Sequence, residues 1–178
     1  MYNSSSTPFC IFALGGRVVY IPKSNLTNKI IKMLDSENIV YDIFEHAPVM
    51  TSLEAAKVRG EPLKIGAKAI IFFADKIPIL VVVPGDRKID TKIFKSIFDI
   101  KDLRMATKEE VLSIATVEVG GVPPIGSAMG IKTYCDEEVL VNEKIAFNAG
   151  SRGVTIKMRS FDYKNIEKPI IGKFSFVL

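Results

Sequence analysis

The chain has 178 residues, of which 48% are hydrophobic and 25% are charged, and its formal net charge is +4 with a pI near 9.0. This composition is that of an ordinary globular protein, and the length suits one domain with a substantial core. Two cysteines and a single histidine exclude a disulfide framework and a conventional zinc site.

The remaining bulk features favour a cytoplasmic protein. No apolar run approaches the ~18 residues of a membrane span. Residues 8–22 are apolar but make a poor signal peptide, because Gly15, Gly16 and Arg17 interrupt them and no basic region precedes them. The mild positive charge permits a polyanionic partner without requiring one, since the chain has no extended block of Lys and Arg.

The first part of the chain predicts short strands and one amphipathic helix. Residues 1–8 are Ser-rich and expected to be flexible. Gly15 and Gly16 separate two apolar runs and predict a hairpin turn. Helical spacing of apolar residues begins at Ser24 and ends before Asn38. The predicted strands of this part cover residues 9–14, 17–21, 40–45, 65–73 and 79–83.

Three further helices are indicated by their N-terminal residues. Thr51-Ser-Leu-Glu54 and Thr107-Lys-Glu-Glu110 are capping boxes, in which the threonine and glutamate side chains satisfy the first free amides of a helix. Gly60 can close the first of these helices, and Asp90 can cap a third. The predicted strand of residues 79–83 ends in the turn Pro84-Gly85-Asp86.

The C-terminal part predicts strands at residues 139–141, 145–148, 154–158 and 170–177, with a helix at residues 160–168. Many short strands with four or five short helices, and no βα repeat, indicate an α+β fold with a mixed or largely antiparallel sheet. No internal repeat or linker is evident, so we expect a single domain over residues 1–178.

The stretch from Val117 to Gly130 contains four glycines and the adjacent prolines Pro123 and Pro124. Glycine allows close approach of a ligand to the backbone, whereas proline fixes φ and removes an amide donor. The stretch therefore predicts a stiff loop whose remaining amides could face a ligand. On these residues alone, a turn between strands is the favoured interpretation.

Lys68 is unusual because it interrupts the apolar strand Ile65-Gly-Ala-Lys-Ala-Ile-Ile-Phe-Phe73. A lysine there either reaches water from an edge or faces a cavity with an anionic or carbonyl partner. His46 and Cys135 lie in no recognisable triad, and a thiolate beside Asp136 is disfavoured. The chain has no P-loop, no GxGxxG motif after a strand and no HExxH motif.

Four segments form an ordered set of motifs. They are Phe44-Glu-His-Ala-Pro48 with Thr51-Ser-Leu-Glu-Ala-Ala56, Ile65-Gly-Ala-Lys68, Val119-Gly-Gly-Val-Pro-Pro-Ile-Gly126, and Phe147-Asn-Ala-Gly-Ser-Arg-Gly-Val-Thr-Ile156. Each motif is weak alone, whereas the ordered set over residues 29–163 is fairly specific. Together the segments resemble the YbaK/ProX aminoacyl-tRNA deacylases, which are relatives of the editing (insertion) domain of prolyl-tRNA synthetase.

This resemblance implies a mixed, barrel-like β-sheet surrounded by short helices. It implies a core over residues 25–165, to which the hairpin of residues 9–21 is an addition. The implied activity is hydrolysis of the ester between a mischarged small amino acid, alanine or cysteine, and the 3′ end of a tRNA, with tRNA-Pro as a candidate. No metal or other cofactor is implied, and neither a membrane nor DNA is an expected partner.

The resemblance also implies roles for individual residues. Lys68 would act as a fixed positive charge on the terminal phosphate or the substrate carbonyl, and the amides of Gly120 and Gly121 would hold the aminoacyl carbonyl. A neighbouring ribose hydroxyl would help to activate water. The substrate-binding residues would be Phe44, His46, Val122, Pro123, Pro124, Asn148, Gly150, Ser151 and Thr155.

Departures from the family pattern leave two other functions open. Ala69 stands where relatives often have threonine, Phe44 where an aromatic hydroxyl is common, and Thr155 where an acidic residue is frequent. These changes allow a tRNA- or nucleotide-binding module with weak catalysis. A synthetase-associated interaction protein, docking through the hairpin of residues 9–21, is the second alternative.

Overall fold

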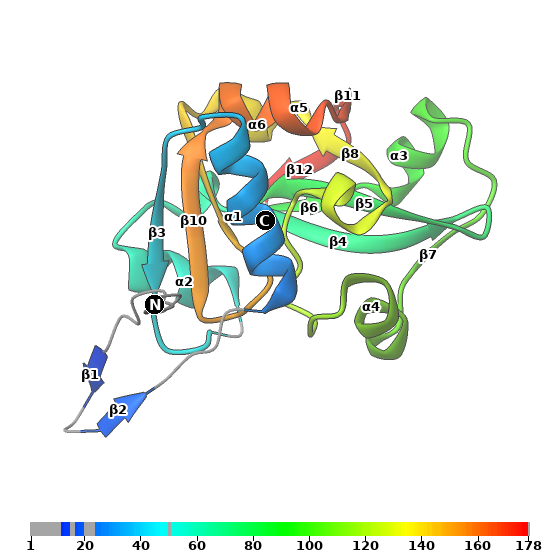
Figure 1. Cartoon of the computed structure of the whole chain (residues 1–178). Coiled ribbons are helices and arrows are strands. Elements are labelled where there is room, and N and C mark those ends of the chain that lie inside the picture. Colours follow the sequence, from blue (N-terminus) through cyan, green and yellow to red (C-terminus); the bar gives the residue numbers. More distant parts are fainter. Residues whose placement is uncertain (1–11, 15–16, 20–23, 50, 178) are drawn as a thin grey trace.

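The computed structural model describes residues 12–14, 17–19, 24–49 and 51–177 (Figure 1). Within these residues the helices are short, and none is both long and apolar enough to cross a lipid bilayer. The α-helices are α1 (Asn25–Ser36), α2 (Ser52–Arg59), α3 (Thr91–Ile97), α4 (Lys108–Ala115), α5 (Glu137–Val141) and α6 (Ser160–Glu167), and the 3₁₀ turns are η1 (Leu63–Ile65) and η2 (Gly126–Met129).

The described strands form two larger sheets and two strand pairs. The five-stranded sheet has the order β11-β8-β5-β4-β7, and the antiparallel three-stranded sheet has the order β3-β10-β9. The strands are β1 (Phe12–Leu14), β2 (Arg17–Val19), β3 (Tyr41–Glu45), β4 (Ala67–Ala74), β5 (Ile77–Pro84), β6 (Arg87–Ile89), β7 (Leu103–Met105), β8 (Lys132–Asp136), β9 (Lys144–Asn148), β10 (Val154–Arg159), β11 (Ile170–Gly172) and β12 (Ser175–Val177).

The mixed α+β class is therefore confirmed. In the five-stranded sheet, β4 is antiparallel to β5 and β7, whereas β8 is parallel to β5 and β11. A bridge between Gly66 and Ala146 joins the beginning of β4 to β9, so the two larger sheets are continuous at that point. The single-domain organisation remains a prediction.

The predicted capping residues begin the helices as expected. Thr51 and Thr107 both form complete capping boxes, at the starts of α2 and α4, and Asp90 accepts bonds from two amides at the start of α3. Gly60 ends α2 in the left-handed conformation with φ +66°. These starts are local, because each needs only a side chain within three residues of the free amides.

The five-stranded sheet has a hydrophobic core on each face. Ala67 and Ile71 of β4 pack into the core beneath α1 and the Gly-rich loop, whereas Phe72 packs into the core around Phe94 of α3. This alternation follows from the two-residue period of a strand. It places Lys68 on the face of Phe72, opposite the face that contacts the Gly-rich loop.

Two predicted strands are wrong. Residues 139–141 belong to helix α5, because Asp136 caps the amide of Glu138 and two glutamates in the first turn favour a helix start. The single strand predicted over residues 170–177 is divided into β11 and β12, which belong to different sheets. Phe174 lies between them, with its side chain buried and its amide donating to Asp136 at 2.8 Å.

The N-terminal predictions are tested only in part. Strands β1 and β2 pair antiparallel, with Phe12 opposite Val19, as the hairpin prediction requires. The predicted turn residues Gly15 and Gly16 and the flexible segment of residues 1–8 lie outside the described residues. The same holds for Cys10, whereas Cys135 is a free, buried cysteine.

Candidate functional site

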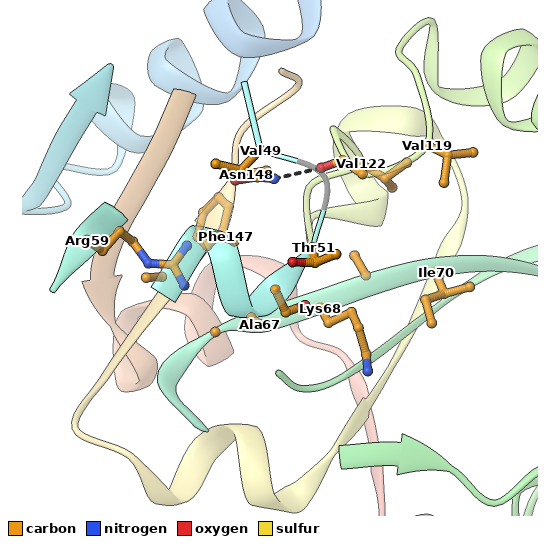
Figure 2. A pocket seen from close by; sticks show the side chains of 16 residues that line it. Val49, Thr51, Arg59, Ala67, Lys68, Ile70, Val119, Val122, Phe147 and Asn148 are labelled. Atoms are coloured by element: carbon orange, nitrogen blue, oxygen red, sulfur yellow. Dashed lines mark hydrogen bonds between the residues drawn. The ribbon is translucent and has the colours of Figure 1, made fainter. Parts of the chain in front are cut away.

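A cavity of about 230 Å³ lies between β4, α2, β9 and the Gly-rich loop (Figure 2). Strand β7 pairs only with the far end of β4, so among the described strands none pairs with the edge of β4 at Lys68 on that side. Residues from both faces of β4 can therefore line the cavity. The lining residues are Val49, Thr51, Ser52, Ala55, Arg59, Gly66, Ala67, Lys68, Ala69, Ile70, Val119, Gly120, Val122, Ala146, Phe147 and Asn148.

The Gly-rich loop brings unbonded backbone donors to this cavity. Gly120 has φ +89°, which strongly favours glycine, and its carbonyl accepts a bond from Asn148 Nδ2 at 2.7 Å (Figure 2). Within the described part of the chain, the amides of Gly120 and Val122 donate no hydrogen bond. The Gly121 amide is already engaged, because it donates to the Glu118 carbonyl at 2.9 Å.

The opposite side of the loop is held by the turn that follows β9. The Gly150 amide donates to the Gly121 carbonyl at 2.9 Å, and Arg152 Nε donates to the Val119 carbonyl at 2.9 Å. Arg152 also pairs with Glu118 at 3.0 Å. A side chain on Gly121 would come within 3.4 Å of the Ser151 backbone, so the glycine allows this close contact. The two segments therefore form one rigid wall.

A second set of contacts anchors the loop from the core. The Tyr163 hydroxyl donates to the Pro124 carbonyl at 2.9 Å, and burial raises the pKa of Tyr163 well above 10, which keeps it a neutral donor. Further along, Glu167 accepts bonds from the Ser127 amide and hydroxyl and from Thr133. Pro123 and Pro124 are buried in this region and do not line the cavity.

A polar chain connects the cavity to His46. The buried Thr155 hydroxyl lies 2.9 Å from His46 Nε2 and 3.5 Å from Asn148 Oδ1. His46 Nδ1 lies 2.9 Å from the Ala47 carbonyl, which can only accept, so Nδ1 carries a proton. In the neutral imidazole Nε2 must then accept from Thr155, and the single Thr155 proton is not available to Asn148 Oδ1 at the same time. The Asn148 side chain is held instead through Nδ2, which donates to the Gly120 carbonyl, and neither His46 nor Thr155 lines the cavity.

Lys68 lines the cavity but its ammonium group is directed elsewhere. Nζ donates to the Arg87 carbonyl at 2.6 Å, and Figure 2 shows the side chain extending away from Asn148 and Val122. Burial, together with the nearby charge of Lys88, lowers the Lys68 pKa, and Asp86 partly opposes this. The ammonium is therefore a poorly compensated charge at the open edge of β4.

The remaining predicted residues lie beside the cavity rather than in its wall. Phe44 is 44% exposed on β3 and pairs in register with Thr155. Gly150 and Ser151 form the turn against the loop. The structure thus brings Lys68, Gly120, Val122 and Asn148 to one cavity, and the other predicted residues are not part of its lining.

Sequence reasoning missed several lining residues. Thr51 was recognised as a helix cap and as part of a family motif but not as a site residue, and Arg59 at the other end of the same helix was not considered. Phe147, which stands in the segment that resembles the family, is buried against the cavity. A cation immediately before the helix-ending Gly60 was the one available signal for Arg59, and it is also common in ordinary helices. In the described residues, no three His, Cys, Asp or Glu side chains form a metal-ligand set.

The family model described as "Aminoacyl-tRNA editing domain" matches residues 46–166 of this chain. The proline–tRNA ligase of Bacillus velezensis is 34% identical over 101 residues, which are 57% of this chain and 17% of that protein. The uncharacterized Bacillus subtilis protein YwhH is 35% identical over 107 residues, covering 59% of this chain and 67% of that protein. The chain thus spans about a sixth of the ligase's length.

A solved structure supports the same fold. It is described as a candidate trans-editing enzyme for prolyl-tRNA synthetase, and it matches with a TM-score of 0.76 at 21% identity, covering 87% of this chain and 99% of that one. At this level of identity the likeness concerns the fold alone. The resemblance inferred from the four motifs is confirmed by these matches.

Proposed function

This chain belongs to the aminoacyl-tRNA editing domain family, and from that premise we propose that it hydrolyses the ester of a mischarged aminoacyl-tRNA in trans. The aminoacylated 3′ end of tRNA would be its partner, and the cytoplasm its location. The observation that carries the proposal is the single cavity lined by Lys68, Gly120, Val122 and Asn148. Association with a synthetase remains a prediction.

The proposed chemistry uses backbone amides that point at developing negative charge. An aminoacyl ester is already activated, so donors placed where the oxyanion forms can supply much of the rate enhancement. We assign these donors to Gly120 and Val122, because their amides have no partner among the described residues whereas that of Gly121 does. Asn148 supports the assignment by holding the Gly120 carbonyl, and with it the orientation of the adjoining peptides.

Lys68 would act as a fixed positive charge rather than as a nucleophile. Its ammonium lies on the β6 side of the open edge, bonded to the Arg87 carbonyl. That position favours contact with the phosphate of the terminal nucleotide over contact with the ester carbonyl. Among the described residues that line the cavity there is no His, Asp or Glu to act as a general base. A ribose hydroxyl of the substrate would therefore help to orient the attacking water.

The cavity size fits a sieve for small amino acids. Its volume of about 230 Å³ is below the roughly 300–1,000 Å³ of pockets for drug-sized ligands, and Val49, Val119 and Val122 narrow it. A synthetase pocket gains only about 1–3 kcal/mol from one methylene group, which is too little to reject smaller amino acids. A second, smaller pocket can hydrolyse the ester of the smaller amino acid and exclude that of the larger one.

The proposal is tested by incubating the protein with tRNA-Pro charged with alanine, cysteine or serine and following the loss of the ester. We expect hydrolysis of at least one of these substrates, and its near-complete loss in Lys68→Ala. Full activity of Lys68→Ala, or no hydrolysis of any mischarged tRNA, would overturn the proposal.

A binding module without turnover is the second candidate, because Ala69 lines the cavity where relatives often carry a threonine hydroxyl. Tight binding of a non-hydrolysable aminoacyl-adenosine analogue together with no measurable turnover would favour this function. Ready turnover would eliminate it.

A further inference from the structure

Arg59 lines the cavity, and it joins no hydrogen bond or ion pair with any other described residue. Its Nε is completely buried. Arg59 as a whole is only partly buried, but a buried donor such as its Nε is unfavourable without an acceptor, since an unsatisfied buried polar group costs about 1–3 kcal/mol. Such a group is therefore poised to bind a ligand atom that accepts a hydrogen bond.

The neighbours of Arg59 leave this requirement unmet. The charge of Glu61 acts on Arg59, but no hydrogen bond joins the two side chains. Glu61 Oε1 pairs with Lys157, and Glu61 Oε2 is buried without a hydrogen-bond partner among the described residues. Arg59 Nη2 lies 3.5 Å from the place that a Cβ would occupy at Gly66, an ordinary contact distance, so the guanidinium lies beside the start of β4. Phe147 and Ala67, labelled with Arg59 in Figure 2, line the same cavity, and their apolar side chains offer the guanidinium no acceptor.

We propose that Arg59 is the specificity-determining residue of this cavity and selects aminoacyl groups whose side chain carries an oxygen acceptor, as serine does, over alanine. This inference rests on the proposed function and narrows its substrate. A site built to hydrogen-bond a substrate hydroxyl rejects the analogue that lacks it, because the protein group is then left unpaired. Serine and alanine differ by that one hydroxyl and fit the same volume.

The alternative ligand for Arg59 is the terminal phosphate, and the structure favours the side chain instead. Lys68 already supplies an ammonium at the open edge of β4, next to Lys88. Arg59, by contrast, projects from the end of α2 into the part of the cavity lined by Gly66, Ala67 and Phe147. A hydrated phosphate suits the open edge, and a small side chain suits the apolar part.

The test compares kcat/KM for seryl- and alanyl-tRNA-Pro prepared on the same tRNA. For the unaltered protein we expect the seryl ester to be hydrolysed roughly tenfold to a hundredfold faster, the range for a hydrogen bond to a charged group. In Arg59→Met the seryl rate should fall to about the alanyl rate, while the alanyl rate changes little. Arg104→Met is the matched control, because Arg104 lies outside the cavity and pairs with Glu110.

Each outcome decides the inference. A ratio near one in the unaltered protein, or an unchanged ratio in Arg59→Met, would overturn it. An equal loss for both esters in Arg59→Met would instead place Arg59 on a phosphate or ribose atom that the two substrates share. Because the ratio is internal to each variant, partial misfolding of Arg59→Met lowers both rates and leaves the ratio interpretable.

A binding measurement separates this inference from the proposed function. The seryl and alanyl amides of 3′-amino-3′-deoxyadenosine resist hydrolysis, so their affinities can be measured by calorimetry even if the protein hydrolyses neither ester. Tighter binding of the seryl analogue, lost in Arg59→Met, supports the role of Arg59 without any turnover. Equal affinities, or no binding of either analogue, would overturn it.

Discussion

The polar side chains at the two ends of the cavity differ in how completely they are hydrogen-bonded, whereas the Gly120 and Val122 backbone amides at the loop end donate no hydrogen bond within the described residues. At the loop end, Asn148 bonds Gly120, Thr155 lies between Asn148 and His46, and Arg152 bonds Val119. At the cation end, Arg59 has no partner among the described residues and Lys68 has only the Arg87 carbonyl. Burial lowers the pKa of both cations.

The hydrogen-bonded side chains at the loop end hold the geometry of the cavity, whereas the cations Arg59 and Lys68 are available to bind a ligand. A satisfied polar network in a low-dielectric interior rigidifies the atoms that it connects, which is what an oxyanion-binding loop needs. Partly buried cations with few or no acceptors destabilise the empty protein, and such groups cluster at sites where a ligand supplies the missing partner. The loop end should therefore respond to mutation through geometry, and the cation end through ligand binding.

The largest expected effect is at Lys68. Lys68→Met should reduce the deacylation rate by roughly 10²–10³-fold, the cost of losing one charge-stabilising donor. The melting temperature should not fall. Because burial lowers the pKa, the charged form is penalised in the folded state at any pH below that pKa, and the penalty is relieved only as the pH rises through it.

Thermal melting at neutral pH, measured beside the rate, checks both parts of this prediction. A marked drop in melting temperature would mean that Lys68 is a structural residue whose bond to the Arg87 carbonyl outweighs its desolvation. That result would remove the distinction between the two ends of the cavity.

The next effect is at Asn148. Asn148→Ala removes the donor to the Gly120 carbonyl, so we expect a tenfold to hundredfold lower rate and a loss of about 1 kcal/mol in the free energy of unfolding. Asn142→Ala is a matched control, since the Asn142 amide bonds the Lys64 carbonyl away from this cavity. Equal activities of the two variants would contradict a positioning role for Asn148.

A smaller effect is expected at Thr155. Thr155→Val keeps the shape but removes the buried hydroxyl between His46 and Asn148, so the free energy of unfolding should fall by about 1–3 kcal/mol. Thr155→Ser keeps the hydroxyl and should lose only about 0.8 kcal/mol for the missing methyl group. Urea denaturation distinguishes these values, and a valine variant as stable as the serine variant would argue against the polar chain.

The smallest expected effect is on the stability and deacylation rate of variants in the two capping boxes. Thr51→Ala and Thr107→Ala should each cost about 1 kcal/mol of stability, because each threonine accepts the same amide bond at the start of its helix. Only Thr51 lines the cavity, so only Thr51→Ala should also reduce the deacylation rate. Melting and activity measurements on the two variants test this, and a parallel loss of activity in Thr107→Ala would show that helix stability alone controls the rate.

Most of the local structure was predictable from the sequence. The starts of α2, α3 and α4 depend on side chains within three residues of the free amides, and the strands β4, β9 and β10 on apolar runs. The two wrongly predicted strands lie where contacts with other parts of the chain determine the secondary structure. The β-branched residues 139 and 141 resemble a strand, but the cap at Asp136 starts a helix, and burial of Phe174 divides the last predicted strand.

The site was predictable only as a set of segments. Lys68, the Gly120 loop and Asn148 were identified from motif order, and they line one cavity. The direction of the Lys68 ammonium could not be predicted from the sequence. It depends on which face of β4 packs against α3 and on where β7 stops pairing with β4. Nor could the sequence distinguish the Gly121 amide, which closes a turn, from the Gly120 amide, which has no partner among the described residues.

By itself, then, the sequence determined the family, the order of most elements and the stiff loop, since caps, glycines, prolines and apolar periodicity act over a few residues. Only the tertiary structure decided which polar groups are satisfied. Asn148 meets a carbonyl 28 residues away and Thr155 meets a histidine 109 residues away, whereas Arg59 meets no acceptor in the described chain. Hydrogen-bond satisfaction depends on what folding brings within about 3 Å, which no local pattern specifies.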